Sequence, residues 1–148
     1  MSAEGQVRIS WDEWGLDIAS ATAGRADCSR RQVGAVIVSP DRRVVATGYN
    51  GAPAGVPGCA SAGACPRALS GVEALVTSYD TGAGACIALH AEQNATLRAS
   101  WADMEGATMY VTCEPCPGCL RTITGTPVER VVWPEGEWLR AEWMVGRG

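Results

Sequence analysis

Apolar residues in the first part of the chain recur at helical spacing. They occupy about every third or fourth position over residues 11–21, as on the buried face of a helix. Ser10 precedes this segment and Glu13 follows three residues later, which is the spacing of a capping box. We therefore expect a first helix that begins after Ser10 and runs to about Gly24.

The next two apolar segments have the composition of strands. Residues 33–38 form a nearly continuous, β-branched run that ends before Pro40, as in a buried strand. Turn residues follow over positions 39–42, and residues 44–49 have a strand-like pattern again. This arrangement predicts a β-hairpin.

Helical and strand-like segments alternate in the second half of the chain. Residues 90–100 have a helical pattern, and residues 107–112 have the pattern of a strand. Pro117 suits the first turn of a helix that ends near Gly125, and residues 128–133 form a last strand. The strand–helix–strand order implies a parallel pair of strands. Together with the hairpin, it predicts an α/β fold built as a three-layer α/β/α sheet.

Two stretches lack a clear period. Residues 51–89 are rich in Gly, Ala and Pro, and a loop this long is uncommon unless it is functional or tied down. Within it we expect a short helical turn at residues 72–78. Residues 135–148 are expected to form a tail in which Trp138 and Trp143 pack back. No repeat or linker divides the chain, which predicts a single domain over residues 1–148.

Charge and hydropathy exclude some classes of protein. The net charge is −4, and the twelve basic residues are all Arg and scattered, which argues against a nucleic-acid binder. No apolar run approaches the roughly 18 residues needed to cross a bilayer, so no membrane association is expected. No signal peptide is visible at the N-terminus, so a cytoplasmic location is expected. Without a secretory signal, the seven cysteines favour thiolates for metal binding or catalysis over disulfides.

The residues with the most informative chemistry surround the sole histidine, His90. Glu92 lies two residues after it, and Cys116 and Cys119 follow Pro115 downstream. One imidazole and two thiolates can hold a zinc ion with an open position, which lowers the pKa of its water to about 7. A nearby carboxylate can then take and return the proton. These residues are the ligands and the proton carrier that a hydrolytic zinc site requires.

The spacing of these residues supports the assignment. Cys116 and Cys119 are separated by three positions in the first turn of the predicted helix, so both sulfurs lie on one face. The helix N-terminus also favours the thiolate form. A lone Cys-x-x-Cys occurs in redox centres and structural zinc sites as well. The combination of His-x-Glu with Pro-Cys-x-x-Cys is the signature of zinc-dependent nucleobase deaminases.

Four segments of the chain carry a resemblance to a known family. They are residues 28–37, 47–55, 90–95 and 106–119. Over about residues 10–133 the chain resembles the cytidine deaminase superfamily. The Gly-Tyr-Asn-Gly segment at residues 48–51 is similar to that of the deoxycytidylate (dCMP) deaminases in particular.

The resemblance implies a reaction and roles for residues. It implies hydrolysis of dCMP to dUMP and ammonia, which supplies dUMP for dTMP synthesis. His90, Cys116 and Cys119 would bind catalytic zinc, and Glu92 would move protons. Asn50 would contact the sugar, with a simple turn residue beside Gly51 as the alternative. Other substrates within the superfamily stay open, namely another base, a nucleoside or a modified dCMP. A non-catalytic, cysteine-rich zinc module is the alternative from a different class.

The remaining cysteines suggest a second, structural zinc. Four of them could hold it as thiolates, namely Cys28, Cys59, Cys65 and Cys86. Cys113 lies three residues before Cys116 and could be a further thiol near the catalytic site, but we expect it to be a buried bystander. Some phage dCMP deaminases carry a second zinc with cysteines at the positions of Cys28 and Cys59 and histidines as the other ligands. No second histidine exists here, so Cys65 and Cys86 replace them. Such a zinc would pin the long insertion, although free thiols or a disulfide are the alternatives.

The resemblance also implies regulation and assembly. Family members are often hexamers activated by dCTP and inhibited by dTTP, so we expect a homo-oligomer, either a hexamer or a dimer. The effector region would include Tyr49, Asn50 and Gly51. A 5′-phosphate requires a cationic partner, for which Arg is well suited. The sequence leaves five candidates for it, which are Arg25, Arg30, Arg31, Arg67 and Arg98.

Overall fold

The computed structural model describes residues 5–71, 79–82 and 84–147. In this part of the chain, helices flank a five-stranded mixed sheet with the strand order β2-β1-β3-β4-β5. The strands are β1 (Gly34–Val38), β2 (Val44–Tyr49), β3 (Thr108–Val111), β4 (Arg130–Trp133) and β5 (Gly136–Leu139). The helices are α1 (Trp11–Ala23), α2 (Pro66–Leu69), α3 (Ala91–Arg98), α4 (Trp101–Met104), α5 (Pro117–Thr124) and α6 (Arg140–Val145).

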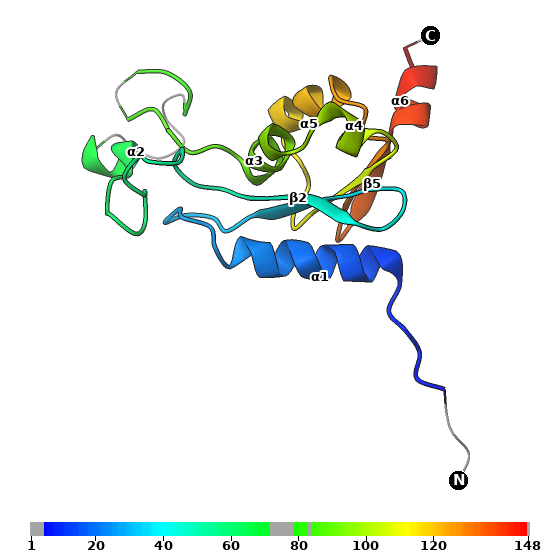
Figure 1. The fold of residues 1–148 in the computed structure, drawn as a ribbon. Helices are drawn as coiled ribbons and strands as arrows, with labels where there is room; N and C mark the ends of the chain where they lie inside the picture. The colour runs from blue at the N-terminus through cyan, green and yellow to red at the C-terminus, as the bar shows by residue number, and fades with distance from the viewer. Residues whose placement is uncertain (1–4, 72–78, 83, 148) are drawn as a thin grey trace.

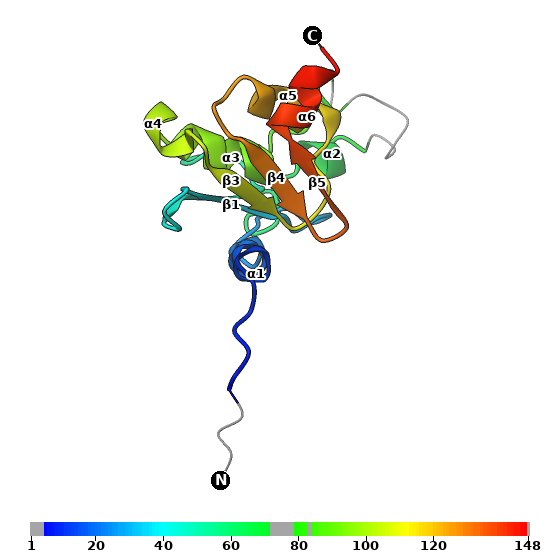
Figure 2. The same ribbon diagram turned by 90° about the vertical axis from the view of Figure 1, so that its right-hand side faces the viewer.

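The helices cover both faces of the sheet. Helix α1 lies alone against one face, and α3 and α5 lie against the other (Figures 1 and 2). Helix α1 begins where the sequence predicts, because the Ser10 hydroxyl accepts the Glu13 N–H at 3.0 Å. The prediction of a three-layer α/β/α arrangement is confirmed.

The strand pairing follows the predicted order. Strand β1 pairs antiparallel with β2 and with β3, so the hairpin prediction is confirmed. Strands β3 and β4 are parallel, as the strand–helix–strand order implies. Because β2 and β3 are both antiparallel to β1, they run in the same direction and end at the same edge of the sheet, where Leu89 pairs with Gly51 just before α3 begins.

The expected tail at residues 135–148 is wrong. Strand β5 pairs antiparallel with β4, and helix α6 follows it. Trp138 packs against the core, and the Arg140 guanidinium donates to the Val128 carbonyl at 2.8 Å and to the Thr126 carbonyl at the end of α5. The prediction failed because β5 contains Gly136 and Glu137 and has no fully buried residue, so it lacks the apolar run that marks β3 and β4, which are equally short.

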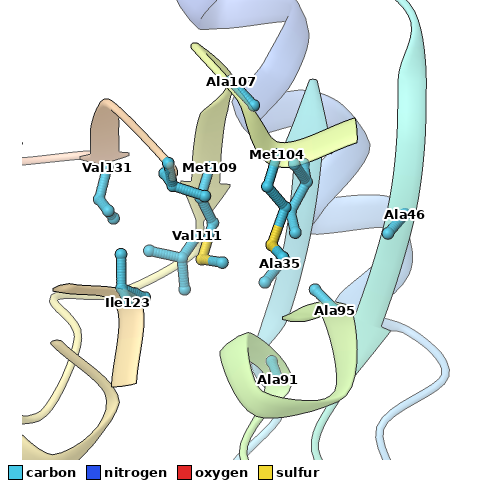
Figure 3. Close-up of a cluster of buried hydrophobic side chains, with 12 residues drawn as sticks. Ala35, Ala46, Ala91, Ala95, Met104, Ala107, Met109, Val111, Ile123 and Val131 are labelled. Atoms are coloured by element: carbon cyan, nitrogen blue, oxygen red, sulfur yellow. The ribbon is translucent and has the colours of Figure 1, made fainter. Parts of the chain in front are cut away.

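Small residues allow α3 to lie close to the sheet. The core on this face combines alanines with Met104, Met109 and Ile123 (Figure 3). Gly48 of β2 faces the first turns of α3, where a Cβ would collide with the Ala91 carbonyl and the Ala95 amide. The position of α3, and of the residues at its N-terminus, therefore depends on the absence of a side chain at residue 48.

Replacing Gly48 with alanine should displace α3 and lower stability. The new Cβ would meet backbone atoms, which cannot rotate away, so we expect a loss at the upper end for overpacking, about 3 kcal/mol. Thermal and urea unfolding measure it. Gly146→Ala is the control, because a Cβ there has ordinary contacts. Equal stability of the G48A and G146A proteins would contradict the tight α3–β2 contact.

Backbone pairing and one carboxylate hold the segment after β2. Gly51 forms isolated β-bridges with Asp27 and with Leu89. The Asp27 carboxylate accepts the Ala60 and Ser61 N–H groups at 2.9 and 2.8 Å and the Ser61 hydroxyl at 2.7 Å. These hydrogen bonds lower the pKa of Asp27. The ionised carboxylate therefore stabilises the folded position of the segment that contains Ala60 and Ser61.

The segment between β2 and α3 contains the short helix α2, which the sequence pattern did not predict. The helical turn expected at residues 72–78 lies outside the described residues. Among the helices that the structure describes, none is both long and apolar enough to span a bilayer.

Candidate active site

His90 is the N-cap of α3, with an extended backbone conformation. Its backbone N–H donates to the Gln93 Oε1 at 2.8 Å, which secures the turn from the loop into the helix. Its imidazole extends toward the start of α5. The histidine and the first turn of α3 are thus presented together at one end of the sheet.

The two cysteines of the motif begin α5. Cys116 is the N-cap, Pro117 occupies the first turn, and the Cys119 N–H points at the Cys116 Sγ at 3.4 Å. The His90 Nδ1 lies 3.5 Å from the Cys116 Sγ and 3.1 Å from the Cys119 Sγ. The structure therefore brings together the three predicted ligands, whose donor atoms all lie within 4.8 Å of one another.

This donor set fits zinc. With Zn–S near 2.3 Å and Zn–N near 2.0–2.1 Å, tetrahedral geometry places two such donors roughly 3.5–3.8 Å apart. The distance from the His90 Nδ1 to the Cys116 Sγ is in this range, and that to the Cys119 Sγ is somewhat shorter. Three protein ligands leave a fourth position for water or substrate, as catalytic zinc sites require.

Glu92 lies in the first turn of α3 and is 4% exposed. Burial, followed by the adjacent Glu92 carboxylate, raises the pKa of the Cys119 thiol. A bound dication reverses this effect, because a coordinating thiol is deprotonated outright. A buried carboxylate beside two thiol groups is thus a costly arrangement that a cation would stabilise.

A cavity of about 100 Å³ opens in front of these residues. Its polar lining includes Glu92, His90, Asn50, Arg31 and Glu114. Cys113 is only partly buried and also lines it, so the alternative of a further thiol near the site describes its position better than a fully buried one. Glu114 was missed, because an exposed glutamate in a loop has no distinguishing pattern.

Asn50 joins the cavity to the backbone of the segment before β1. Its Oδ1 accepts the Val33 N–H at 2.8 Å, and its Nδ2 donates to the Arg31 carbonyl at 2.9 Å. The side chain is buried and borders the cavity. Asn50 therefore holds residues 31–33 in place, a function that the sequence did not indicate, and its expected contact with the sugar stays a prediction.

Tyr49 and Gly51 border a different depression. Its volume is about 600 Å³, and Arg25 and Asp27 line it as well. The Arg25 guanidinium lies 5.9 Å from the centre of the Tyr49 ring. The three residues predicted to bind effectors are thus divided, because Asn50 borders the catalytic cavity and the other two border this depression.

The four cysteines predicted to bind a second zinc line one cavity of about 390 Å³. Burial, followed by the other three thiols, raises the pKa of Cys59. All seven cysteines are free thiols. Within the described residues, His90, Cys116 and Cys119 form the one group of three or more His, Cys, Asp or Glu ligand atoms that lie within 4.8 Å of one another. The sulfurs of the four other cysteines therefore surround their cavity at wider spacing.

The candidate phosphate ligands occupy different places. Arg31 lines both the catalytic cavity and the cysteine-lined cavity, whereas Arg30 and Arg67 line the latter. Arg25 borders the depression at Tyr49, and Arg98 lies in the last turn of α3. Tertiary structure therefore separates five arginines that the sequence left equivalent.

Comparison with known proteins identifies the family. The sequence model of the "cytidine and deoxycytidylate deaminase zinc-binding region" matches residues 9–135. The deoxycytidylate deaminase of Mycobacterium phage D29 is 53% identical over 128 residues, which are 86% of this chain and 97% of that protein. The deoxycytidylate deaminase of Schizosaccharomyces pombe is 39% identical over 129 residues, which are 86% of this chain and 38% of that protein.

A solved structure agrees with this fold. The crystal structure of dCMP deaminase from the cyanophage S-TIM5 in complex with dCMP and dUMP matches with a TM-score of 0.59 and 24% identity. The match covers 86% of this chain and 83% of that one. The sequence matches, the shared fold and the three grouped donors lead to one assignment: this chain belongs to the zinc-binding cytidine and deoxycytidylate deaminase family.

Proposed function

We propose that this protein is a zinc-dependent dCMP deaminase that hydrolyses dCMP to dUMP and ammonia. The observation that carries the proposal is the position of buried Glu92 on the same cavity as the donors His90 and Cys116, with Cys119 beside it. A purely structural zinc site needs no carboxylate there. The 53% identity to a phage deoxycytidylate deaminase supports this substrate within the family.

The residues of the site have distinct tasks. His90 through Nδ1 and the two cysteines through Sγ would hold zinc, which acidifies its water to a pKa of about 7 when bound. The Glu92 carboxylate accepts a proton from the attacking water and delivers it to N3 of the base. A second proton passes through the same carboxylate to the leaving amine. Because Glu92 is buried, few solvent molecules compete for these protons.

We also propose that the thiolates of four cysteines hold a second, structural zinc; the four are Cys28, Cys59, Cys65 and Cys86. Their shared cavity and the burial of Cys59 support it. Binding would draw the four sulfurs inward and fasten the insertion to the segment before β1 and to the approach to His90. Free thiols also suit the cytoplasm, where we place the enzyme as a single catalytic domain.

Regulation and assembly are further parts of the proposal. Arg25 and Asp27 line the depression beside Tyr49 and Gly51. The Asp27 carboxylate is bonded to Ala60 and Ser61, and Arg25 supports binding of a nucleotide effector such as dCTP or dTTP. Asn50 links this region to the catalytic cavity, because its carbonyl accepts the Asp27 N–H at 2.9 Å and its side chain donates to the Arg31 carbonyl. We propose a homo-oligomer, a hexamer or a dimer, as the working form.

A substrate panel tests the proposed reaction. The zinc-loaded protein is mixed with dCMP, CMP, deoxycytidine, dCTP or guanine, and deamination is followed by ultraviolet absorbance. We expect the highest kcat/KM with dCMP and a shift of its saturation curve when dCTP is added. Absence of turnover with dCMP would overturn the assignment. An unchanged curve would remove the effector proposal alone.

A further inference from the structure

Helix α3 carries the expected metal ligand at its start and the proton carrier in its first turn. His90 is its N-cap, and Glu92 lies two residues later. The helix lies close to β2, because Gly48 has no side chain where the Ala91 carbonyl and the Ala95 amide approach. This contact sets the distance between helix and strand. It does not set the rotation of the helix about its own axis, because it includes no directional bond.

Asn94 supplies a directional bond between α3 and the sheet. Its Nδ2 donates to the carbonyl of Tyr49, the last residue of β2, at 2.8 Å. The side chains of Gln93 and Thr96 bond within α3 and its N-cap instead. In the described part of the chain, Asn94 therefore makes the one side-chain hydrogen bond from α3 to a strand. A hydrogen bond requires alignment as well as distance, so this bond resists rotation of the helix.

The Asn94 side chain lies apart from the cavities. It lines neither the catalytic cavity, nor the cysteine-lined cavity, nor the depression beside Tyr49. Glu92 lies two positions before it, and residues at this spacing point to different sides of a helix. The Asn94 amide can thus hold α3 to the sheet while the Glu92 carboxylate faces the catalytic cavity.

A small rotation of α3 would displace the Glu92 carboxylate. Side chains extend roughly 5–6 Å from a helix axis, so a rotation of about 10° moves their ends by about 1 Å. A misplacement of about 1 Å can reduce the rate of a reaction on the order of 100-fold. The metal ligands would be less affected, because Cys116 and Cys119 belong to α5 and His90 precedes the first helical residue of α3.

We propose that Asn94 is a positioning residue for Glu92. Its bond to the Tyr49 carbonyl sets the rotation of α3 and so directs the Glu92 carboxylate toward the attacking water and the base. The inference rests on the proposed deaminase function and adds a residue to its mechanism. Asn94 acts on the proton transfers through Glu92 and does not contribute to substrate affinity.

Three replacements separate the hydrogen bond of Asn94 from its shape. Asn94→Asp keeps the shape, but at about pH 8 the new carboxylate, with an ordinary pKa near 3.9, only accepts hydrogen bonds and faces the Tyr49 carbonyl. Asn94→Leu keeps the approximate volume and has no donor. Asn94→Gln keeps an amide donor on a side chain that is one methylene longer. The kcat and KM of the zinc-loaded full-length protein are measured with dCMP and with deoxycytidine.

We expect Asn94→Asp and Asn94→Leu to lower kcat roughly 10- to 100-fold and to change KM less than about twofold. The factor should be the same for both substrates, because Asn94 contacts neither. Asn94→Gln should recover part of the loss, because it can still donate to the Tyr49 carbonyl. The zinc content of every variant should equal that of the wild type.

Thr22→Val is the control for a general loss of stability. It also removes one side-chain bond to a backbone carbonyl, that of Ile18, but in α1 on the other face of the sheet. We expect a fall in Tm comparable to that of Asn94→Leu and a wild-type kcat. Circular dichroism verifies the fold of each variant, and Asn94→Leu and Asn94→Gln provide the comparison if Asn94→Asp does not fold.

The outcomes separate this inference from the proposed function. Wild-type kcat in Asn94→Asp, a loss confined to KM, or an equal loss of kcat in Thr22→Val would overturn the assignment of Asn94 and leave the deaminase function intact. A wild-type protein inactive on dCMP would overturn the proposed function. Crystal structures of the wild type and Asn94→Asp would then decide the role of Asn94, since an unmoved Glu92 carboxylate contradicts it.

Discussion

The Glu92→Gln protein should bind zinc normally and lose deaminase activity. Glutamine has nearly the same shape as glutamate, so the packing around this buried side chain is preserved. Its amide cannot accept a proton from water and return it to N3 or to the leaving amine. General acid–base catalysis contributes about 10²- to 10⁴-fold, and because both transfers use this one group, we expect a loss of kcat at the upper end.

The measurement compares kcat and zinc content for Glu92→Gln and Glu114→Gln. Glu114 lines the same cavity and is exposed, so the control removes a negative charge from the site without removing the proposed proton carrier. We expect Glu114→Gln to retain most of the turnover. Wild-type turnover in Glu92→Gln would refute the mechanism, and loss of zinc from it would show that the carboxylate has a structural task instead.

Zinc stoichiometry should separate two metal sites. We expect two zinc ions per chain in protein purified without added metal, and one in each of two variants. His90→Ala removes the imidazole from the catalytic site, and two thiolates alone form an incomplete zinc site. The double change Cys59→Ser and Cys65→Ser removes half of the proposed four-cysteine site and leaves the catalytic ligands intact.

The stability of these variants distinguishes the sites further. A structural zinc contributes folding free energy, with apparent values of about 10–16 kcal/mol in zinc-finger peptides. The cysteine double variant should therefore show the larger fall in Tm, and His90→Ala the larger fall in activity. Cys113→Ser is the matched control, and it should retain two zinc ions. One zinc per wild-type chain would eliminate the second site while leaving the catalytic one.

Local pattern was sufficient for much of the fold. Helix α1 was predictable because its apolar period extends over three turns and Ser10 marks its start. Strands β1 and β2 were predictable because an apolar run, a turn and a second run lie next to one another. The elements α2, α4 and β5 each have four residues and lack the apolar run by which the equally short strands β3 and β4 were predicted. Contacts with distant segments specify them instead.

The candidate catalytic residues were predictable for a different reason. His90 with Glu92 and Cys116 with Cys119 form two local motifs, each contained within one helical turn. The chemistry of the residue types then predicts that the motifs meet. Asp27 was not predictable in this way, because its bonds to Ala60 and Ser61 join residues more than thirty positions apart.

The sequence by itself determined the reaction chemistry, because metal ligands and a proton carrier must be particular residue types at short spacing. It also determined the layers of the fold, because burial imposes a period on long helices and strands. Only the tertiary structure decided that Arg31 lines the catalytic cavity and that Asn50 holds the Arg31 backbone by a hydrogen bond. Those relations depend on distances between segments remote in the chain, and no local pattern encodes such distances.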